Sequence, residues 1–384
     1  MPEFAFEALR RRPDVEAANL FASDAADRLL LQTAADALSA PGRSIGDGSV
    51  TVIDDGYGAL TIGAAALHGA RGIRVHQDSI VAERALAANA GRLGHADAYH
   101  SHPLDAALLA GSRVVLLRLP KSLDALDEIA ATVAAHAAPD VTVFAGAMVK
   151  HLTPAMNDVL GRHFGGVQAG LARQKARVLT ATAPGRGTAA AEATERHWPA
   201  CTFHDDVGVW VCAHGGAFAG VKLDIGTRFL LNVLDQAKPA AATAIDLGCG
   251  TGVLAAVLAM RRPGIQVLAT DQSAAAIASA QATAQANGVA DRVQTQRDDA
   301  LSMRADASAD LVVLNPPFHL GTSVHAGAGL KLIEAAGRVL RPGGELWTVF
   351  NSHLGYRAAL GRCVGPTRQI ARNAKFTVTV STKA

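Results

Sequence analysis

A glycine-rich stretch at 246–252, Asp-Leu-Gly-Cys-Gly-Thr-Gly, places the strongest constraint on how this chain folds. An apolar segment beginning at Ala244 leads into it, and an alanine-rich run at 253–260 follows it. This order predicts a strand, a tight turn, and a helix whose first N–H groups face a ligand. A second strand, 266–270, then ends at Asp271, whose carboxylate can accept both hydroxyls of a ribose.

The glycine spacing is G-x-G-x-G, which counts against a dinucleotide enzyme, because those carry G-x-G-x-x-G. The turn and the strand end beside it therefore predict a cofactor site, and Asp271 would also suit a dinucleotide. The residues that we assign to this cofactor site are Asp246, Gly248, Cys249, Gly250, Asp271 and Gln272.

A second motif, Asn315-Pro316-Pro317-Phe318, closes the apolar run 311–314. Proline cannot continue a strand, so the run is predicted to be a buried strand that stops abruptly, and ligands of open α/β sheets bind at such carboxyl ends. The Asn315 amide and the Pro316 carbonyl can accept both N–H bonds of an exocyclic amine while the Phe318 ring stacks on the base. We take all four residues as the candidate catalytic site. A strand-ending turn with a core phenylalanine is the alternative.

Together the two motifs resemble class I S-adenosylmethionine-dependent methyltransferases that act on an exocyclic nitrogen. With His319 added, the second motif is similar to that of the ribosomal RNA guanine-N2 methyltransferases that carry two related domains. Residues 223–227 are similar to a segment that those enzymes place beside the cofactor. Residues 145–151 and 174–177 resemble the large-subunit branch of that family, methyltransferase G. The resemblance spans most of the chain.

The resemblance implies S-adenosylmethionine as the cofactor and a guanine of ribosomal RNA, in the 23S molecule, as the substrate. It places Asn315 beside the cofactor as well as the substrate, and it makes Phe318 and His319 candidates for substrate binding. It also implies a carboxylate for the adenine amino group after the third strand, 293–296. We assign Asp299 to this role, with Asp298 as the alternative, because the sequence does not fix the register to one residue.

The first half of the chain repeats features of the second half in the same order: a glycine turn, an acidic strand end and an apolar strand. The matched pairs are 54–58 with 246–250, Asp78 with Asp271, and 114–117 with 311–314. We therefore predict an α/β protein with two tandem Rossmann-like class I methyltransferase domains that arose by internal duplication. The pattern breaks after 183–188, so the predicted domains are 1–192 and 193–384.

The two copies differ where chemistry would take place. Arg118-Leu119-Pro120-Lys121 stands where the second copy has the Asn315 motif, and it offers cations in place of amine acceptors. The N-terminal domain is therefore predicted to be degenerate, to support the fold, and to contact RNA through Arg118 and Lys121. A purely structural domain is the alternative. Other candidate RNA contacts are basic residues on the same domain: Arg10, Arg11, Arg12, Lys150, Arg173, Lys175 and Arg177.

Charge and cysteine content add further limits. A net charge of +2 over 384 residues does not by itself indicate nucleic-acid binding. The four cysteines lack the density of a disulfide framework, which favours a reducing compartment, and they show no zinc spacing with the histidines. The sequence shows neither an apolar run long enough to span a membrane nor a signal-like N-terminus. We expect a cytoplasmic monomer with no metal and no membrane contact.

Three other functions stay open at this stage. The Asn315 motif also suits adenine-N6 methylation of nucleic acid and methylation of glutamine side chains in proteins, because each acceptor is an sp² nitrogen. The duplicated architecture favours guanine in ribosomal RNA. Outside enzymes, the chain could be an RNA-binding assembly protein with a vestigial cofactor fold. The intact Asp246, Gly248, Gly250 and Asn315 argue against that function.

Overall fold

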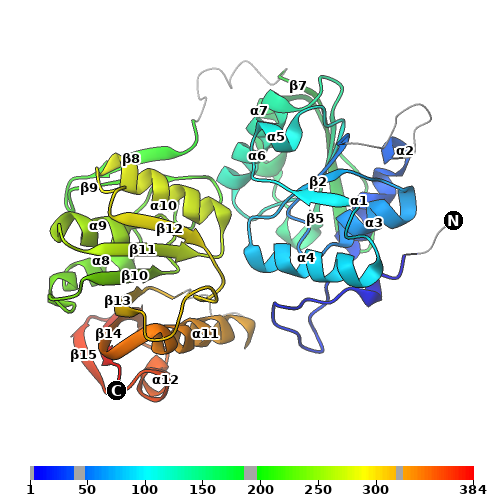
Figure 1. Ribbon diagram of the computed structural model, residues 1–384. Helices are drawn as coiled ribbons and strands as arrows, with labels where there is room; N and C mark the ends of the chain where they lie inside the picture. The colour runs from blue at the N-terminus through cyan, green and yellow to red at the C-terminus, as the bar shows by residue number, and fades with distance from the viewer. Residues whose placement is uncertain (1–3, 39–47, 186–196, 317–322) are drawn as a thin grey trace. The chain divides into compact units, whose positions relative to one another are not determined.

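The protein divides into two compact units, which Figure 1 shows as a computed structural model. Unit 1 is Met1–His197 and unit 2 is Trp198–Ala384. The structure describes residues 4–38, 48–185, 197–316 and 323–384. The domain boundary predicted at residue 192 lies outside the described residues.

Unit 1 is built on a seven-stranded sheet with the strand order β3-β2-β1-β4-β5-β7-β6. The first five strands in this order pair in parallel, and β7 pairs antiparallel with both β5 and β6. The strands are β1 Val50–Ile53, β2 Ile73–His76, β3 Tyr99–Ser101, β4 Val114–Arg118, β5 Thr142–Met148, β6 Phe164–Ala169 and β7 Ala176–Pro184. The helices are η1 Phe6–Ala8, α1 Ala25–Thr33, α2 Ala35–Leu38, α3 Ala59–His68, α4 Ile80–Leu93, α5 Ala106–Leu109, α6 Leu123–His136, η2 Val149–His151 and α7 Pro154–His163.

Unit 2 repeats this design with the strand order β12-β11-β10-β13-β14-β16-β15. Again five strands are parallel, and β16 is antiparallel to its two neighbours. The strands are β10 Thr243–Leu247, β11 Gln266–Asp271, β12 Val293–Arg297, β13 Ala309–Leu314, β14 Leu340–Asn351, β15 Thr367–Arg372 and β16 Phe376–Thr382. The helices are α8 Ile225–Leu231, η4 Leu234–Gln236, α9 Val253–Arg261, α10 Ala274–Ala286, α11 Ser323–Val339 and α12 Tyr356–Cys363.

Both sheets are buried on two faces, as parallel strands require. In β10, Ala244 belongs to a core shared with α9 and α10, whereas its neighbour Ile245 belongs to a core shared with α11 and α12. In unit 1, Val52 and Ile53 divide in the same way between two cores. Figure 1 shows helices on both sides of each sheet. The shared strand order and layering confirm the prediction of two Rossmann-like domains of one type.

A hairpin of β8 Ala200–His204 and β9 Val209–Ala213 precedes the sheet of unit 2. Its register places Cys201 directly opposite Cys212, and the two form a disulfide with a Cα–Cα distance of 4.1 Å. The low density of cysteines was a poor guide here, because cysteine spacing alone does not reveal a cross-strand pair. This disulfide removes the basis on which a reducing compartment was expected.

Among the described residues, no helix is long and apolar enough to cross a membrane. In the same part of the chain, no three or more His, Cys, Asp or Glu side chains come together in a group that could hold a metal ion.

Candidate active site

The glycine turn connects β10 to the N-terminus of α9. Gly248, Gly250 and Gly252 have φ angles of 69°, 52° and 74°, which glycine adopts without steric cost. A Cβ atom at Gly252 would lie 2.7 Å from the Ala280 Cβ, whereas one at Gly248 or Gly250 would meet nothing within 4 Å. Gly252 therefore lets α9 pack against α10, and the other two glycines border space where a ligand can approach the backbone. The predicted strand, turn and helix are confirmed.

Asp271 ends β11 beside this turn. Its Oδ2 accepts the Gly250 N–H at 3.1 Å, and its Oδ1 accepts the Ser273 N–H at 3.0 Å. These contacts hold the carboxylate beside the glycine turn. Gln272 follows as an exposed residue, and its backbone carbonyl accepts a bond from Arg297 at 3.4 Å. The structure thus brings the two predicted halves of the cofactor site together.

Asp246 and Cys249, in contrast, are buried. Asp246 is 1% exposed, and its Oδ2 accepts the Ala255 N–H of α9 at 3.0 Å. Cys249 is 9% exposed, its N–H bonds to the Thr270 carbonyl at 3.0 Å, and burial raises the pKa of its thiol. Both side chains support the turn from within. Their predicted role at the cofactor site is therefore to shape the backbone that faces a ligand.

Burial also raises the pKa of Asp246 to about 7, from 3.8. The folded protein therefore favours the protonated acid, and this stabilisation is lost as the pH rises from about 4 through about 7. We expect Asp246→Asn, which cannot ionise, to gain stability over the wild type between pH 5 and pH 8, by on the order of 2 kcal/mol. Urea unfolding at both pH values measures the difference. The same substitution at the exposed Asp205 is the control. An Asp246→Asn effect independent of pH would contradict this account.

The two acidic residues after β12 have different surroundings. Asp298 is 2% exposed, and it accepts bonds from Ser302 Oγ and, at 3.0 Å, from the Met303 N–H. Asp299 instead points its carboxylate toward α11, where both oxygens accept bonds from Lys331 Nζ at 2.6 Å. Asp298 stabilises its own loop. Asp299 thus remains the better candidate for the adenine contact.

Asn315 follows β13 directly and is half-buried. Its Nδ2 donates to Asp224 Oδ2 and to Thr227 Oγ1, each at 2.9 Å, at the start of α8. Its Oδ1 is buried and has no hydrogen-bond partner. The family resemblance implied that the segment 223–227 lies beside the cofactor. These contacts were not predicted, because nothing in the sequence pairs residues about ninety positions apart.

Unit 1 shows how the two copies correspond, and here the predicted alignment was partly wrong. Asp54, Gly56 and Gly58 have φ angles of 59°, 77° and 97° and lead into α3, as Gly248, Gly250 and Gly252 lead into α9. The Gly56 N–H donates to Gln77 Oε1 at 3.3 Å, as the Gly250 N–H does to Asp271. The true match is therefore 54–58 with 248–252, and Gln77, not Asp78, with Asp271. The two copies share the backbone conformation of the turn, but their acidic residues stand at different positions of the alignment.

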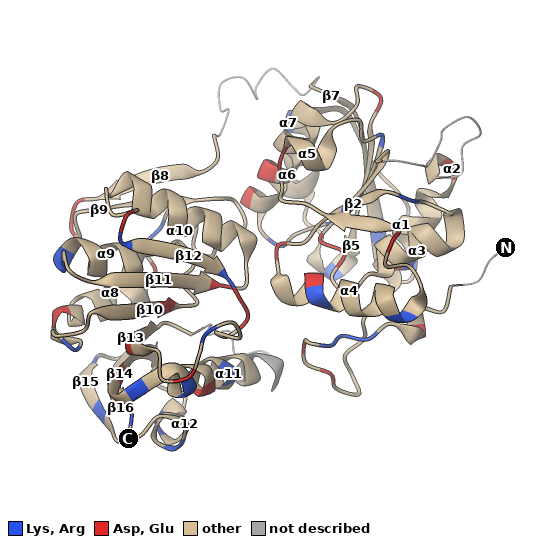
Figure 2. Ribbon diagram, viewed as in Figure 1, with Lys and Arg blue, Asp and Glu red and all other residues tan. Residues whose placement is uncertain are grey.

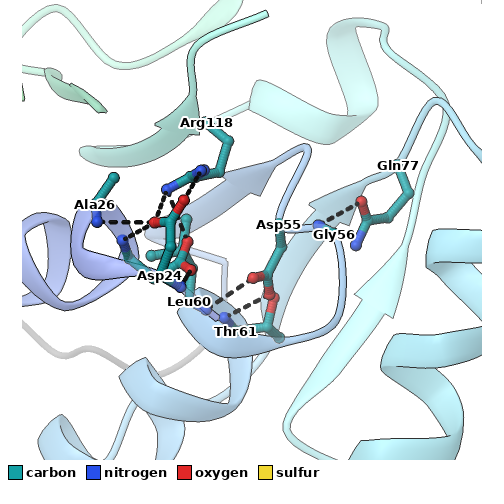
Figure 3. A network of polar contacts seen from close by, with 9 residues as sticks. Asp24, Ala26, Asp55, Gly56, Leu60, Thr61, Gln77 and Arg118 are labelled. Atoms are coloured by element: carbon teal, nitrogen blue, oxygen red, sulfur yellow. Dashed lines mark hydrogen bonds and ion pairs between the residues drawn. The ribbon is translucent and has the colours of Figure 1, made fainter. Parts of the chain in front are cut away.

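The match of Arg118 with Asn315 holds, since β1 and β10 pair in the same register with the strands that end there. Arg118 donates to both oxygens of Asp24 at 2.8 and 2.9 Å and lies 3.1 Å from Asp27 (Figure 3). Asp55 is buried beside this group and accepts the N–H groups of Leu60 and Thr61. Arg118 was predicted to contact RNA, but its guanidinium is already bound by the carboxylates of Asp24 and Asp27. Lys121 is exposed.

Burial raises the pKa of Asp27 to about 7, and the Arg118 charge opposes this shift. Arg118, Asp24 and Asp27 thus occupy the strand end of unit 1 that corresponds to the Asn315 site. Three of the predicted site residues, Pro317, Phe318 and His319, lie outside the described residues. Pro316 is buried.

The strand order and the glycine turn with its acidic neighbour define unit 2 as a class I methyltransferase fold. The family model "Methyltransferase small domain" matches residues 208–380, and the model "RLMG N-terminal domain" matches residues 2–185. Among solved structures, the 16S rRNA N2 G1207 methyltransferase RsmC of T. thermophilus, in complex with AdoMet and guanosine, is similar over 91% of each chain. The TM-score is 0.67 at 20% identity, which supports a common fold.

Curated relatives are more similar in sequence. The ribosomal RNA large subunit methyltransferase G of Pseudomonas entomophila is 35% identical over 98% of this chain and 97% of its own length. The protein of the same name from Streptomyces avermitilis is 36% identical over 97% and 95%. The chain belongs to the family of ribosomal RNA large subunit methyltransferase G.

The residues present fit the cofactor of this fold. Gly248 and Gly250 leave open space against the backbone, and Asp271 is tied to the same turn. The unpartnered Asn315 Oδ1 is an acceptor at the next strand end. Asp271, the glycine turn and Asn315 therefore lie at the ends of adjacent strands of one sheet, in the order β11-β10-β13.

Proposed function

We propose that this protein transfers a methyl group from S-adenosylmethionine to the exocyclic N2 of a guanine in large-subunit ribosomal RNA. The relatives that this chain matches over nearly their whole length are named ribosomal RNA large subunit methyltransferase G. The single observation in the structure that supports an amine acceptor is the buried Asn315 Oδ1, which lacks a partner and can receive an N–H bond.

Each residue of the site then has one task. Gly248 and Gly250 admit the cofactor to the backbone, Asp271 accepts from its ribose, and Asp299 accepts from its adenine. S-adenosylmethionine supplies a methyl group activated by a sulfonium. Asn315 Oδ1 and the Pro316 carbonyl hold the two hydrogens of the guanine amine, so that the lone pair on nitrogen faces the methyl group.

The nitrogen forms its new bond to carbon as the carbon–sulfur bond breaks, and the cationic nitrogen then loses one proton to water. Because positive charge grows on nitrogen during transfer, two oxygen acceptors stabilise the transition state more than the ground state. Phe318 and His319 are proposed to contact the guanine after it leaves the RNA stack.

Unit 1 is proposed to support the fold and to bind RNA backbone. In each unit, Lys and Arg are interspersed with Asp and Glu (Figure 2). RNA binding by unit 1 would therefore depend on a local group of basic side chains. Partial burial lowers the pKa of His151, and the nearby charges of Lys150 and Lys121 lower it further. These residues follow β4 and β5. Lys121 and Lys150 therefore form a basic pair that suits phosphates, with the His151 imidazole beside them.

We expect Lys121→Glu combined with Lys150→Glu to raise the KM for RNA about tenfold at moderate salt, because two phosphate contacts become repulsive. The affinity for S-adenosylmethionine should not change. Lys375→Glu combined with Lys383→Glu, both in unit 2, is the charge-matched control. Steady-state kinetics at two salt concentrations give the result. An unchanged KM would leave unit 1 with a structural role alone.

We propose that a monomer is active, because the described candidate cofactor and amine residues all belong to unit 2. We also propose the cytoplasm as its location, because its proposed substrate is ribosomal RNA.

The test of this function supplies labelled S-adenosylmethionine with protein-free 23S and 16S RNA, each compared with its ribosomal subunit. We expect transfer to the large-subunit RNA, whether free or assembled. Transfer to 16S RNA alone would move the substrate to the small subunit. Cofactor binding with no transfer to any RNA would favour glutamine methylation in a protein, or a role in RNA binding and assembly without catalysis.

A further inference from the structure

Two side chains at the N-terminus of α8 accept both hydrogens of the Asn315 amide nitrogen. Both hydrogens of Nδ2 have an acceptor at 2.9 Å, one on Asp224 and one on Thr227. Asp224 is itself fixed, because it is the N-cap of α8 and its Oδ2 also accepts the Thr227 N–H at 2.9 Å. The amide is thus bound to a rigid helix end.

These contacts decide which atom of the amide is presented to a substrate. An asparagine amide can rotate by 180° with little change in shape, and rotation exchanges a donor with an acceptor. In the rotated form, Oδ1 would face the Asp224 carboxylate, and the Nδ2 hydrogens would occupy the buried place where Oδ1 now lies. Repulsion between oxygens disfavours that form, so Asp224 and Thr227 select Oδ1 as the free acceptor.

Unit 1 contains the same arrangement with other side chains. Arg118 takes the place of Asn315, and it contacts Asp24 and Asp27, the N-cap residue and the third residue of α1 (Figure 3). Asp224 and Thr227 hold these two positions on α8. The two units therefore share this contact between a strand end and a helix N-terminus. In unit 1, two carboxylates bind a guanidinium, and in unit 2, a carboxylate and a hydroxyl bind an amide.

One further difference concerns the space beside the acceptor in unit 2. At the second helical position, α1 has Ala26 and α8 has Gly226. A Cβ atom at Gly226 would lie 3.0 Å from Asp224 Oδ2 and 3.4 Å from Asn315 Oδ1. A side chain here would therefore crowd the held amide on the side of its free oxygen.

We propose that Asp224 and Thr227 are positioning residues for methyl transfer, which rests on the function proposed above. They orient the Asn315 amide so that Oδ1 meets the substrate amine. The negative charge of Asp224 also polarises the amide and makes Oδ1 a stronger acceptor as the amine becomes cationic. Their effect falls on kcat, because the amine gains its charge only during transfer.

Thr227→Val and Thr227→Ser form a matched pair for the test. Valine keeps the shape of threonine and removes the hydroxyl, so we expect kcat on ribosomal RNA to fall about tenfold, as the loss of one hydrogen bond suggests. Serine keeps the hydroxyl and should restore kcat to within about twofold. The KM for RNA and the affinity for S-adenosylmethionine, measured by calorimetry, should not change. Equal losses in both variants, or an unchanged kcat in Thr227→Val, would overturn the proposal.

Asp224→Asn separates the charge from the helix cap. Asparagine still caps a helix and can still accept from Asn315, so melting temperature and cofactor affinity should stay near wild type while kcat falls. A lower melting temperature with an unchanged kcat would show that Asp224 only caps α8. The methylated nucleoside made by the wild type reports on the proposed function by itself. A wrong guanine assignment therefore appears in the wild type, and a wrong positioning role appears only in the variants.

Discussion

Asn315→Ala is expected to lower kcat for methyl transfer by about 10²- to 10³-fold, the range seen when an enzyme loses one preorganised group that stabilises charge in the transition state. The substitution removes the buried Oδ1 acceptor, and it leaves Asp224 and Thr227 without the amide that they hold. The affinity for S-adenosylmethionine should change by less than about threefold, because the cofactor site depends on the glycine turn and Asp271.

Two measurements decide this prediction: single-turnover transfer to RNA, and calorimetric binding of S-adenosylmethionine. Asn232→Ala is the matched control, because Asn232 is exposed and lies at the far end of the same helix, α8. Activity in the Asn315→Ala protein within tenfold of wild type would refute its role as amine acceptor. Parallel loss of cofactor binding would show that Asn315 belongs to the cofactor site instead.

Asp271→Ala should act on binding. We expect its dissociation constant for S-adenosylmethionine to rise about 100-fold, because hydrogen bonds to a charged carboxylate contribute about 1.5–3 kcal/mol each. The same carboxylate also holds the Gly250 and Ser273 N–H groups, so its removal loosens the glycine turn. At saturating cofactor, kcat should return to within a few-fold of wild type.

The chain provides its own control for this variant. Gln77 occupies the corresponding position in unit 1, where it accepts from Gly56. Gln77→Ala should leave the affinity and the stoichiometry of one cofactor per chain unchanged. If Gln77→Ala weakens binding as much as Asp271→Ala does, unit 1 also takes part in cofactor binding, and the division between the two units is wrong.

Much of this site was predictable from sequence because its parts are local. The run from Asp246 to Gly252 determines a strand, a turn and a helix by residue type alone, and Asn315-Pro316 marks a strand end in the same way. The correspondence of Arg118 with Asn315 was also correct, since both follow four apolar residues that form equivalent central strands.

The alignment of the two glycine turns was wrong for a physical reason. The glycine turns were aligned through their acidic residues, but the folded copies preserve the sequence of left-handed backbone positions, and Asp54 occupies one of them. Aspartate tolerates this conformation better than most residues, so the fold allowed the change. Residue type is a poor guide where the backbone conformation is what the copies share.

Long-range partners were beyond reach for a different reason. Arg118 was predicted to meet RNA because an unpaired cation after a strand suggests an anionic ligand. Its actual partners, Asp24 and Asp27, lie at the start of α1, more than ninety residues earlier in the chain. The Cys201–Cys212 bond likewise depends on the register of a hairpin. Tertiary packing determines both, and no local pattern encodes it.

The most direct test of the central claim is nucleoside analysis of large-subunit RNA after methylation by the purified protein with labelled S-adenosylmethionine. The account predicts that the label is found in N2-methylguanosine, and that the Asn315→Ala protein produces almost none of it. Label in N6-methyladenosine would contradict the assignment to guanine. Label in protein glutamine, with none in RNA, would contradict ribosomal RNA as the substrate.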